Sequence, residues 1–279
     1  MTDSTLIPFT ASDGDNLALR DWPLTDVRPL RGMVVLVHGL GEHSGRYHDL
    51  ARRLNGWGFS VRGYDQYGHG ESGGARGALS SQSRLVDDLA DVIETTRRRM
   101  RPGLPLLVLG HSLGGLVAAS AVAQGTVAVD GLVLSSPALE AGLNAVQKLL
   151  LATLPHIAPN LTLGNGLDPE FLSHDSGVIA RYRADPMVHD RISARLGRFI
   201  AEAGPRVVQS AAQWKVPTLL MYAGADKLVD PTGSRAFAAA APPEVVTVRC
   251  FDDLYHEIFN ERDADPVFDQ LRQWLHERF

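Results

Sequence analysis

The pattern of hydrophobic and polar residues changes along the chain from alternation to short, continuously apolar runs. Near the N-terminus, the runs LIPFTA (6–11) and LALRDW (17–22) flank Asp13-Gly14, an arrangement that is typical of a β-hairpin. The later runs are apolar on both faces, as are strands buried inside a parallel sheet. These runs are GMVVLVH, FSVRGYD, LPLLVLG, GLVLSSP, PTLLMYAG and VVTVRCF.

Helical patterns lie between these runs and continue to the end of the chain. Strand and helix alternate over most of the length, which predicts an α/β fold with a mostly parallel, doubly wound central sheet and helices on both faces. The helical segments are YHDLARRLNGWG, SRLVDDLADVIETTRRRM, LGGLVAASAVAQG, GSRAFAAAAP and DPVFDQLRQWLHERF.

One stretch interrupts the alternation. Between about residues 138 and 213 the pattern predicts no strand, and the segments GLNAVQKLLLATLPHIAPNLTLG and SARLGRFIAEAG are helical or irregular and apolar on one side. We interpret residues 138–213 as a helical lid inserted over the strand ends. Residues 1–137 and 214–279 then form the α/β core.

Composition and charge narrow the class of protein. The 279 residues are 44% hydrophobic and 21% charged, which is ordinary for a globular protein. The net charge of −5 and the pI near 6.0 argue against a nucleic-acid partner, since such proteins carry a basic surface. The single cysteine leaves no intrachain disulfide. With no signal-peptide pattern and no apolar run of about 18 residues, we expect a cytoplasmic protein.

The strongest chemical signal is the pentapeptide Gly110-His111-Ser112-Leu113-Gly114, which matches G-x-S-x-G. It follows an apolar strand-like run and opens a helix of small residues. In this context the motif predicts a nucleophilic serine on a cramped strand-to-helix turn. Ser112 is therefore the candidate nucleophile, rather than an incidental serine in a glycine-rich turn.

A serine hydroxyl needs a base, usually a histidine that a carboxylate orients, and on such a fold the order is serine, acid, histidine. Among the histidines after Ser112, His256 follows the last strand-like run, where sites form in such sheets. Asp226 follows the preceding run and is the favoured acid. Asp230 is better explained as a helix N-cap. The acids at 252 and 253 are too near His256 in sequence to be favoured.

The catalyst also needs two N–H donors for the negatively charged oxygen of the tetrahedral intermediate. One is expected from the backbone of Leu113, the residue after the nucleophile, and the other from the loop after an early strand. In that loop, HGLGEHSG, we choose Leu40 as the second oxyanion donor. His111, next to Ser112, is expected to point away from the reaction.

The loop around Leu40 could instead be a plain turn or a phosphate cradle. Its spacing, Gly39-x-Gly41-x-x-x-Gly45, differs from the nucleotide-binding pattern, and Glu42 would repel a phosphate. No cluster of metal ligands stands out in the sequence, and hydrolysis by a serine triad needs no cofactor. We therefore predict neither a metal nor a cofactor.

Several motifs together resemble one family, the monoacylglycerol lipases of the serine α/β-hydrolases, from about residue 9 to the C-terminus. The resemblance implies the α/β-hydrolase fold, the triad Ser112, Asp226 and His256, and the oxyanion donors Leu40 and Leu113. It also implies an enzyme that cleaves monoacylglycerols to fatty acid and glycerol through an acyl-enzyme. The motifs are HGLGEHSGRY, YDQYGHGESGG, GHSLGGLVA, LVLSSPAL, NLTLG, YRADPMV and GADKLVD.

The same resemblance implies a polar pocket for the glycerol head group and a lid that meets membranes or micelles transiently. Glu42 and Arg46 match positions near the polar end, either as neighbours of the head group or as an ion pair that braces the loop. Tyr182 matches a tyrosine of the lid. The sequence departs from the mammalian members at Phe259, where they carry a further histidine.

Two alternatives remain beside the predicted lipid-ester substrate. A lysophospholipase or a broad-specificity carboxylesterase would use the same triad, and a phosphocholine head group would favour acidic or aromatic residues around the alcohol. A binding or regulatory protein on a hydrolase scaffold is less compatible with the sequence, because such proteins often lack the nucleophile, the base or the acid.

Overall fold

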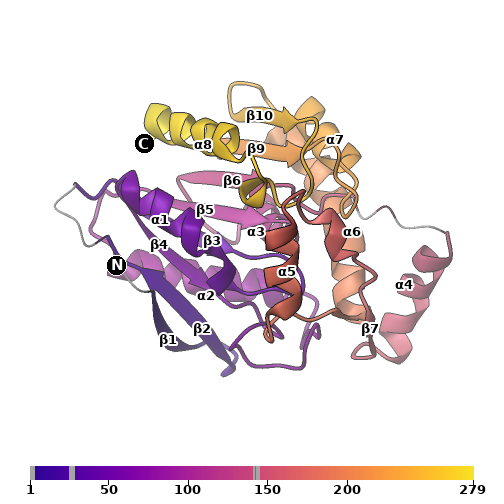
Figure 1. Cartoon of the computed structure of the whole chain (residues 1–279). Coiled ribbons are helices and arrows are strands. Elements are labelled where there is room, and N and C mark those ends of the chain that lie inside the picture. Colours follow the sequence, from indigo (N-terminus) through magenta and orange to yellow (C-terminus); the bar gives the residue numbers. More distant parts are fainter. Residues whose placement is uncertain (1–3, 25–28, 141, 143–144) are drawn as a thin grey trace.

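The computed structural model describes residues 4–24, 29–140, 142 and 145–279, with only the backbone of residues 145–150. The strands of its main sheet are β1 (Thr5–Thr10), β2 (Asn16–Trp22), β3 (Gly32–Val37), β4 (Phe59–Tyr64), β5 (Leu106–His111), β6 (Gly131–Ser135), β9 (Thr218–Ala223) and β10 (Val246–Phe251). They lie in the order β1-β2-β4-β3-β5-β6-β9-β10 (Figure 1). The first hairpin is antiparallel and β2 runs antiparallel to β4, whereas β4 to β10 are parallel.

The continuous apolar runs are explained by burial of the sheet on both faces. Val35 and Val37 of β3 belong to one hydrophobic cluster, while Val34 and Leu36 belong to the other. Because successive side chains of a strand point to opposite faces, a strand covered on both sides must be apolar at every position. The predicted parallel sheet is confirmed.

Helices cover the two faces of the sheet as predicted (Figure 1). Residues of α1 (His48–Gly56) and α8 (Asp265–Arg278) pack in the cluster that contains Val34. Residues of α2 (Arg84–Arg99), α3 (Leu113–Ala123) and α7 (Thr232–Ala240) pack in the cluster that contains Val35. In the described part of the chain, no helix is both long and apolar enough to cross a membrane.

Between β6 and β9 the chain leaves the sheet, and we call residues 138–213 the insertion; its residues 141 and 143–144 lie outside the described residues. It holds α4 (Ala145–Ile157), α5 (Ser176–Ala184) and α6 (Ala194–Ser210), and Figure 1 shows α4 far from the sheet. Short 3-10 helices complete the fold at Ser44–Tyr47, Pro169–Phe171, Ala211–Gln213 and Ile258–Asn260.

The expectation of an insertion without strands was wrong in one detail. β7 (Thr162–Gly164) and β8 (Arg191–Ser193) form a separate antiparallel pair, with Leu163 opposite Ile192. Each strand has three residues, so neither is long enough to show an alternating pattern in the sequence.

Candidate active site

Ser112 stands on a strained turn between β5 and α3. Its backbone has φ 53° and ψ −118°, a region that residues other than glycine rarely occupy. A Cβ atom added at Gly110 would collide with the carbonyl oxygen of Gly114, and one added at Gly114 would collide with that of Val37. Both glycines of the motif are therefore required by close backbone packing, and the turn presents Ser112 at the carboxyl edge of the sheet.

Asp226 and His256 come from the loops that follow β9 and β10. His256 Nδ1 lies 2.7 Å from Asp226 Oδ2, and Asp226 Oδ1 accepts hydrogen bonds from the N–H groups of Leu228 (2.9 Å) and Val229 (3.0 Å). Burial acts to raise the pKa of Asp226, but His256 and these N–H groups outweigh it and lower the pKa. An ionised Asp226 keeps the proton on Nδ1, so Nε2 of His256 is free to accept one.

Ser112 and His256 line the same small pocket. Among the described residues, no hydrogen bond joins Ser112 Oγ to His256 Nε2. Catalytic hydrogen bonds are often long without substrate and tighten when it binds, so this geometry is compatible with proton transfer between the two groups.

His111 does not turn away from this pocket, and that expectation was wrong. Its ring lies 4.7 Å from the His256 ring, centroid to centroid, and its Nδ1 lies 3.1 Å from Ser135 Oγ. Burial, aided by His256, lowers the pKa of His111 to about 4, so the ring is neutral at neutral pH. The uncharged His111 ring therefore packs against the ring of His256. The expectation that neighbouring side chains diverge at the turn did not predict this contact.

The loop after β3 passes directly against the serine. A Cβ atom at Gly39 would lie 3.3 Å from Ser112 Cβ and 2.8 Å from Glu42 Oε1. The next residue, Leu40, lines a cavity together with Ser112 and Leu113. In the described part of the chain, the N–H groups of Leu40 and Leu113 have no protein acceptor, which is the condition of an oxyanion donor before substrate binds.

Glu42 holds this loop in place. Its Oε1 accepts hydrogen bonds from the N–H of Gly39 and from the Tyr47 hydroxyl, both at 2.6 Å, and its Oε2 accepts one from Arg46 at 2.5 Å. Burial acts to raise the pKa of Glu42, but the Arg46 guanidinium lowers it to about 2. The ionised carboxylate therefore fixes the peptide immediately before Leu40.

Arg46 also binds Glu257, a residue that the sequence analysis did not select. Its two terminal nitrogens donate to Glu257 Oε1 at 2.7 Å and Oε2 at 2.9 Å, and its guanidinium lies 4.8 Å from the centre of the Tyr182 ring. Asn260 Nδ2 donates to Glu257 Oε2 at 2.7 Å. The signal available in the sequence was the position of Glu257 directly after His256, in HEIFNE.

Two hollows meet at Ser112. One is a polar pocket of about 30 Å³, lined by Glu42, Arg46, Tyr182, His256 and Glu257 among others. The other is a cavity of about 510 Å³, which is lined mainly by leucine and isoleucine side chains. Burial raises the pKa of Tyr182 to about 12, so its hydroxyl stays protonated in the polar pocket.

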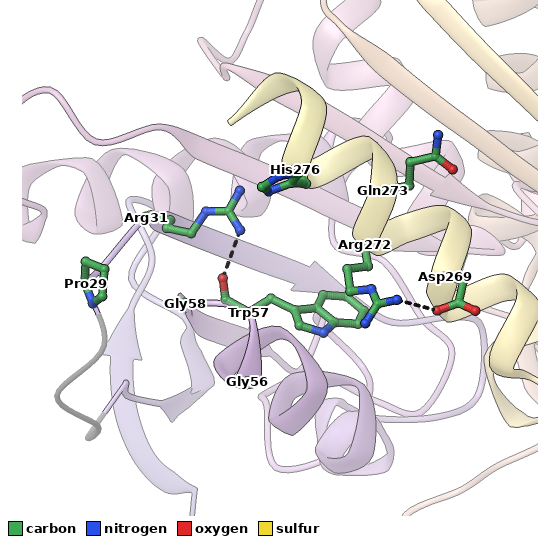
Figure 2. A pocket seen from close by; sticks show the side chains of 9 residues that line it. All are labelled: Pro29, Arg31, Gly56, Trp57, Gly58, Asp269, Arg272, Gln273 and His276. Carbon is green, nitrogen blue, oxygen red and sulfur yellow. Dashed lines mark hydrogen bonds and ion pairs between the residues drawn. The ribbon is translucent and has the colours of Figure 1, made fainter.

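A third hollow, of about 580 Å³, lies between helix α8 and the C-terminal end of α1. None of its lining residues lines the polar pocket or the apolar cavity. Figure 2 shows its charged groups engaged with the protein. Arg31 donates to the carbonyl of Trp57 at 3.2 Å, and Arg272 pairs with Asp269 at 3.0 Å. We assign no chemistry to it.

The other acidic candidates lie apart from His256 Nδ1. Asp230 accepts a hydrogen bond from the N–H of Thr232, but the N-cap of α7 is Pro231, so the expectation of an N-cap at Asp230 was wrong by one position. Asp252 accepts one from the thiol of Cys250.

Phe259 packs against Phe268, with ring centroids 5.2 Å apart, so it supplies no polar contact. Among the described residues, no group of three or more histidine, cysteine or acidic side chains could hold a metal ion.

A parallel sheet with a strained serine after β5 and a His–Asp pair after β9 and β10 is the arrangement of a serine hydrolase of the α/β-hydrolase class. The family model described as serine aminopeptidase, S33, matches residues 28–263.

Relatives narrow this class further. A monoacylglycerol lipase of Mycolicibacterium smegmatis is 36% identical over 96% of this chain and 95% of its own length. The human monoglyceride lipase is 32% identical over 96% of this chain and 89% of its own. The crystal structure of a Paleococcus ferrophilus monoacylglycerol lipase superimposes with a TM-score of 0.82 at 35% identity, over 99% of this chain and all of that one. The chain belongs to the S33 hydrolase family, in the branch that contains the monoacylglycerol lipases.

Proposed function

We propose that this protein hydrolyses monoacylglycerols to a fatty acid and glycerol through an acyl-enzyme on Ser112. The observation that carries the proposal is the position of Ser112 at the junction of a polar pocket and an apolar cavity of about 510 Å³. The polar alcohol and the apolar acyl chain of such an ester match the chemical character of the two hollows. The relatives from M. smegmatis and human carry the corresponding names over nearly the whole chain.

The position of His256 indicates which hollow receives the alcohol of the substrate and which receives the acyl chain. His256 lines the polar pocket but not the apolar cavity. The base that takes the serine proton later gives it to the leaving alcohol, so the alcohol lies on the His256 side. The acyl chain then occupies the apolar cavity, where each buried CH₂ contributes about 0.8 kcal/mol.

In the first half of the reaction, His256 Nε2 takes the proton from Ser112 Oγ as this oxygen attacks the ester carbonyl carbon. Asp226 stabilises the imidazolium that forms, and the N–H groups of Leu40 and Leu113 donate to the oxyanion. The intermediate then collapses. The bond to glycerol breaks, His256 protonates the departing oxygen, and the acyl group stays on Ser112.

In the second half, water enters the place that glycerol has left. His256 removes a proton from the water, whose oxygen attacks the acyl carbon, and the same two N–H groups stabilise the second oxyanion. Ser112 departs with the proton that His256 returns. The fatty acid leaves, and no cofactor takes part.

For Glu42 and Arg46 the contacts favour bracing over direct binding of the head group. Glu42 accepts from Gly39 and Tyr47, and Arg46 is held by two carboxylates. Their role is to hold Leu40 N–H toward the oxyanion. Tyr182 closes the alcohol end of the pocket beside Arg46.

We also propose that the insertion is a lid that contacts membranes or micelles. It supplies Leu151, Leu154 and Ile200 to the cavity, whereas the side chains of residues 148–150 in the expected segment KLLLATL lie outside the described residues. Ile157 is 83% exposed and Leu163 is 52% exposed, in α4 and β7 of the same insertion. Exposed apolar side chains on the insertion that lines a lipid-binding cavity favour peripheral contact with a lipid surface.

The test is a series of substrates with purified protein. We expect kcat/KM for 1- and 2-monoacylglycerols with long chains to exceed that for diacylglycerols and for short p-nitrophenyl esters. A fluorophosphonate probe should label Ser112 in the folded protein. Short esters that are favoured by orders of magnitude would instead define a general carboxylesterase, and absence of labelling would remove the proposed nucleophile.

A further inference from the structure

The alcohol pocket contains more negative than positive charge. Among the described residues that line it, the carboxylates are Glu42, Asp168 and Glu257, and the one guanidinium is that of Arg46. Glu42 and Glu257 are buried, with 3% and 5% of their surface exposed, whereas Asp168 is exposed at the rim. The buried part of the cluster therefore has two carboxylates around one cation and a net charge of −1.

The cation of this cluster has little capacity left for a ligand. One terminal nitrogen of Arg46 donates to both Glu42 and Glu257, and the other donates to Glu257 at 2.9 Å. The Tyr182 ring lies 4.8 Å from the guanidinium carbon. A phosphate that entered the pocket would have to displace a buried carboxylate from Arg46, which is costly when that carboxylate is left unpaired.

Without Glu257, the same pocket would be balanced. Glu42 alone neutralises Arg46, and it also holds the N–H of Gly39 and the Tyr47 hydroxyl. The Glu257 carboxylate binds Arg46 and Asn260, and its backbone N–H donates to the carbonyl of Leu172; within the described residues it has no hydrogen bond to the oxyanion loop other than through Arg46. Its carboxylate is thus the surplus charge, directly beside the base in the sequence.

We propose that Glu257 is a specificity-determining residue that makes the alcohol pocket reject anionic head groups, so that the enzyme takes esters of neutral or cationic alcohols. The inference rests on the proposed function, since it concerns the alcohol end of the same site. At an effective dielectric constant of about 20, one unbalanced charge at about 8 Å disfavours an anion by roughly 30-fold. Phosphate monoesters of acylglycerols are the class excluded.

The experiment compares esters with one acyl chain and alcohols of different charge: acylcholine, 1-monoacylglycerol and 1-acylglycerol 3-phosphate. By the same arithmetic, we expect kcat/KM of the unmodified enzyme to be higher for the cationic ester than for the neutral one, and at least about tenfold lower for the anionic ester than for the neutral one. Glu257→Gln keeps the shape and removes the charge, so it should narrow the gap between neutral and anionic esters by about tenfold or more.

Glu170→Gln is the matched control. Glu170 lies in the insertion, next in sequence to Pro169 of the pocket wall, but its side chain is 54% exposed, pairs with Arg183 and does not line the pocket. Its substitution should leave both the monoacylglycerol activity and the charge ratio unchanged. An unchanged ratio in Glu257→Gln, or equal effects of the two substitutions, would overturn the proposal.

Two features keep the test decisive. If Glu257→Gln fails to fold, the unmodified enzyme still tests the proposal. Equal kcat/KM for anionic and neutral esters would by itself overturn it. A preference for the neutral ester that weakens with added salt would support its electrostatic origin. The same comparison of cationic, neutral and anionic alcohols can be made with butyrate esters. It measures the charge preference of the alcohol pocket even if long-chain monoacylglycerols are not substrates. Failure of the proposed function and failure of this inference therefore give different results.

Discussion

The two hollows that meet at Ser112 are built in opposite ways. The polar pocket is about 30 Å³, and its central groups come from the segments of the α/β core that follow β3 and β10, where Glu42 and Glu257 both bind Arg46. The apolar cavity is about 510 Å³ and takes most of its side chains from the insertion. The difference indicates a division of labour. We propose that the core holds the reacting groups in fixed positions and that the insertion provides the space that selects the acyl chain of the substrate.

The largest effect is expected on the boundary between the two hollows. Ser112→Ala removes the nucleophile and should lower kcat by about 10⁴-fold or more, because only binding and the oxyanion donors remain. Turnover of 1-monoacylglycerol and far-UV circular dichroism check activity and fold together. Substantial residual turnover in a folded variant would mean that another group attacks the ester.

A change on the polar side should act on the chemical step. Glu42→Ala leaves the N–H of Gly39 without its acceptor and releases the peptide before Leu40. Loss of one oxyanion donor typically lowers kcat by about 10²–10³-fold. We expect this loss for esters of every chain length. A drop confined to long-chain esters would contradict the separation of the two regions.

A change on the apolar side should act on chain length. A Cβ atom at Gly197 of α6 would lie 2.8 Å from Leu151 Cδ2, so Gly197→Val fills the cavity at that point. Loss of room for two or three CH₂ groups should lower kcat/KM for long-chain esters by about 10–50-fold. Butyrate esters are the internal control and should be hydrolysed at the original rate.

The smallest effect on turnover is expected from the neutral histidine of the polar pocket, which should act on acid stability. The pKa of His111 is about 4 in the folded chain and about 6.5 in an unfolded one. Between these values the unfolded state binds a proton that the folded state does not, so stability rises with pH from about 4 to 6.5. In His111→Asn the slope of unfolding free energy against pH should fall by about 1 kcal/mol per pH unit on average over this range, below the limit of about 1.4 for one whole proton. Urea unfolding at pH 4.5, 5.5 and 6.5 measures it, and an unchanged slope would exclude this role.

Much of the fold was predictable because its signals are local. The burial of β3 on both faces is visible as consecutive apolar residues, and the steric need for glycine around Ser112 is contained within the five positions of G-x-S-x-G. The pair β7 and β8 was missed because three-residue strands show no period. The orientation of His111 was missed because the His256 ring, which lies against it, comes from a loop far along the chain.

The sequence by itself determined the order of strands and helices along the chain, the cramped turn at Ser112 and the choice of Asp226 and His256. The turn is set by backbone sterics, which act over a few residues. The acid and the base are set by chain order, which leaves few candidates after Ser112. Only the tertiary structure decided that Arg46 is shared by Glu42 and Glu257, which is 211 residues away from it. It alone also showed that Glu42 holds the loop HGLGEHSG through the N–H of Gly39, and that Glu257 adds a second buried carboxylate on Arg46. Such a charge balance depends on which side chains meet and how deeply they are buried, and neither is written in the spacing of residues.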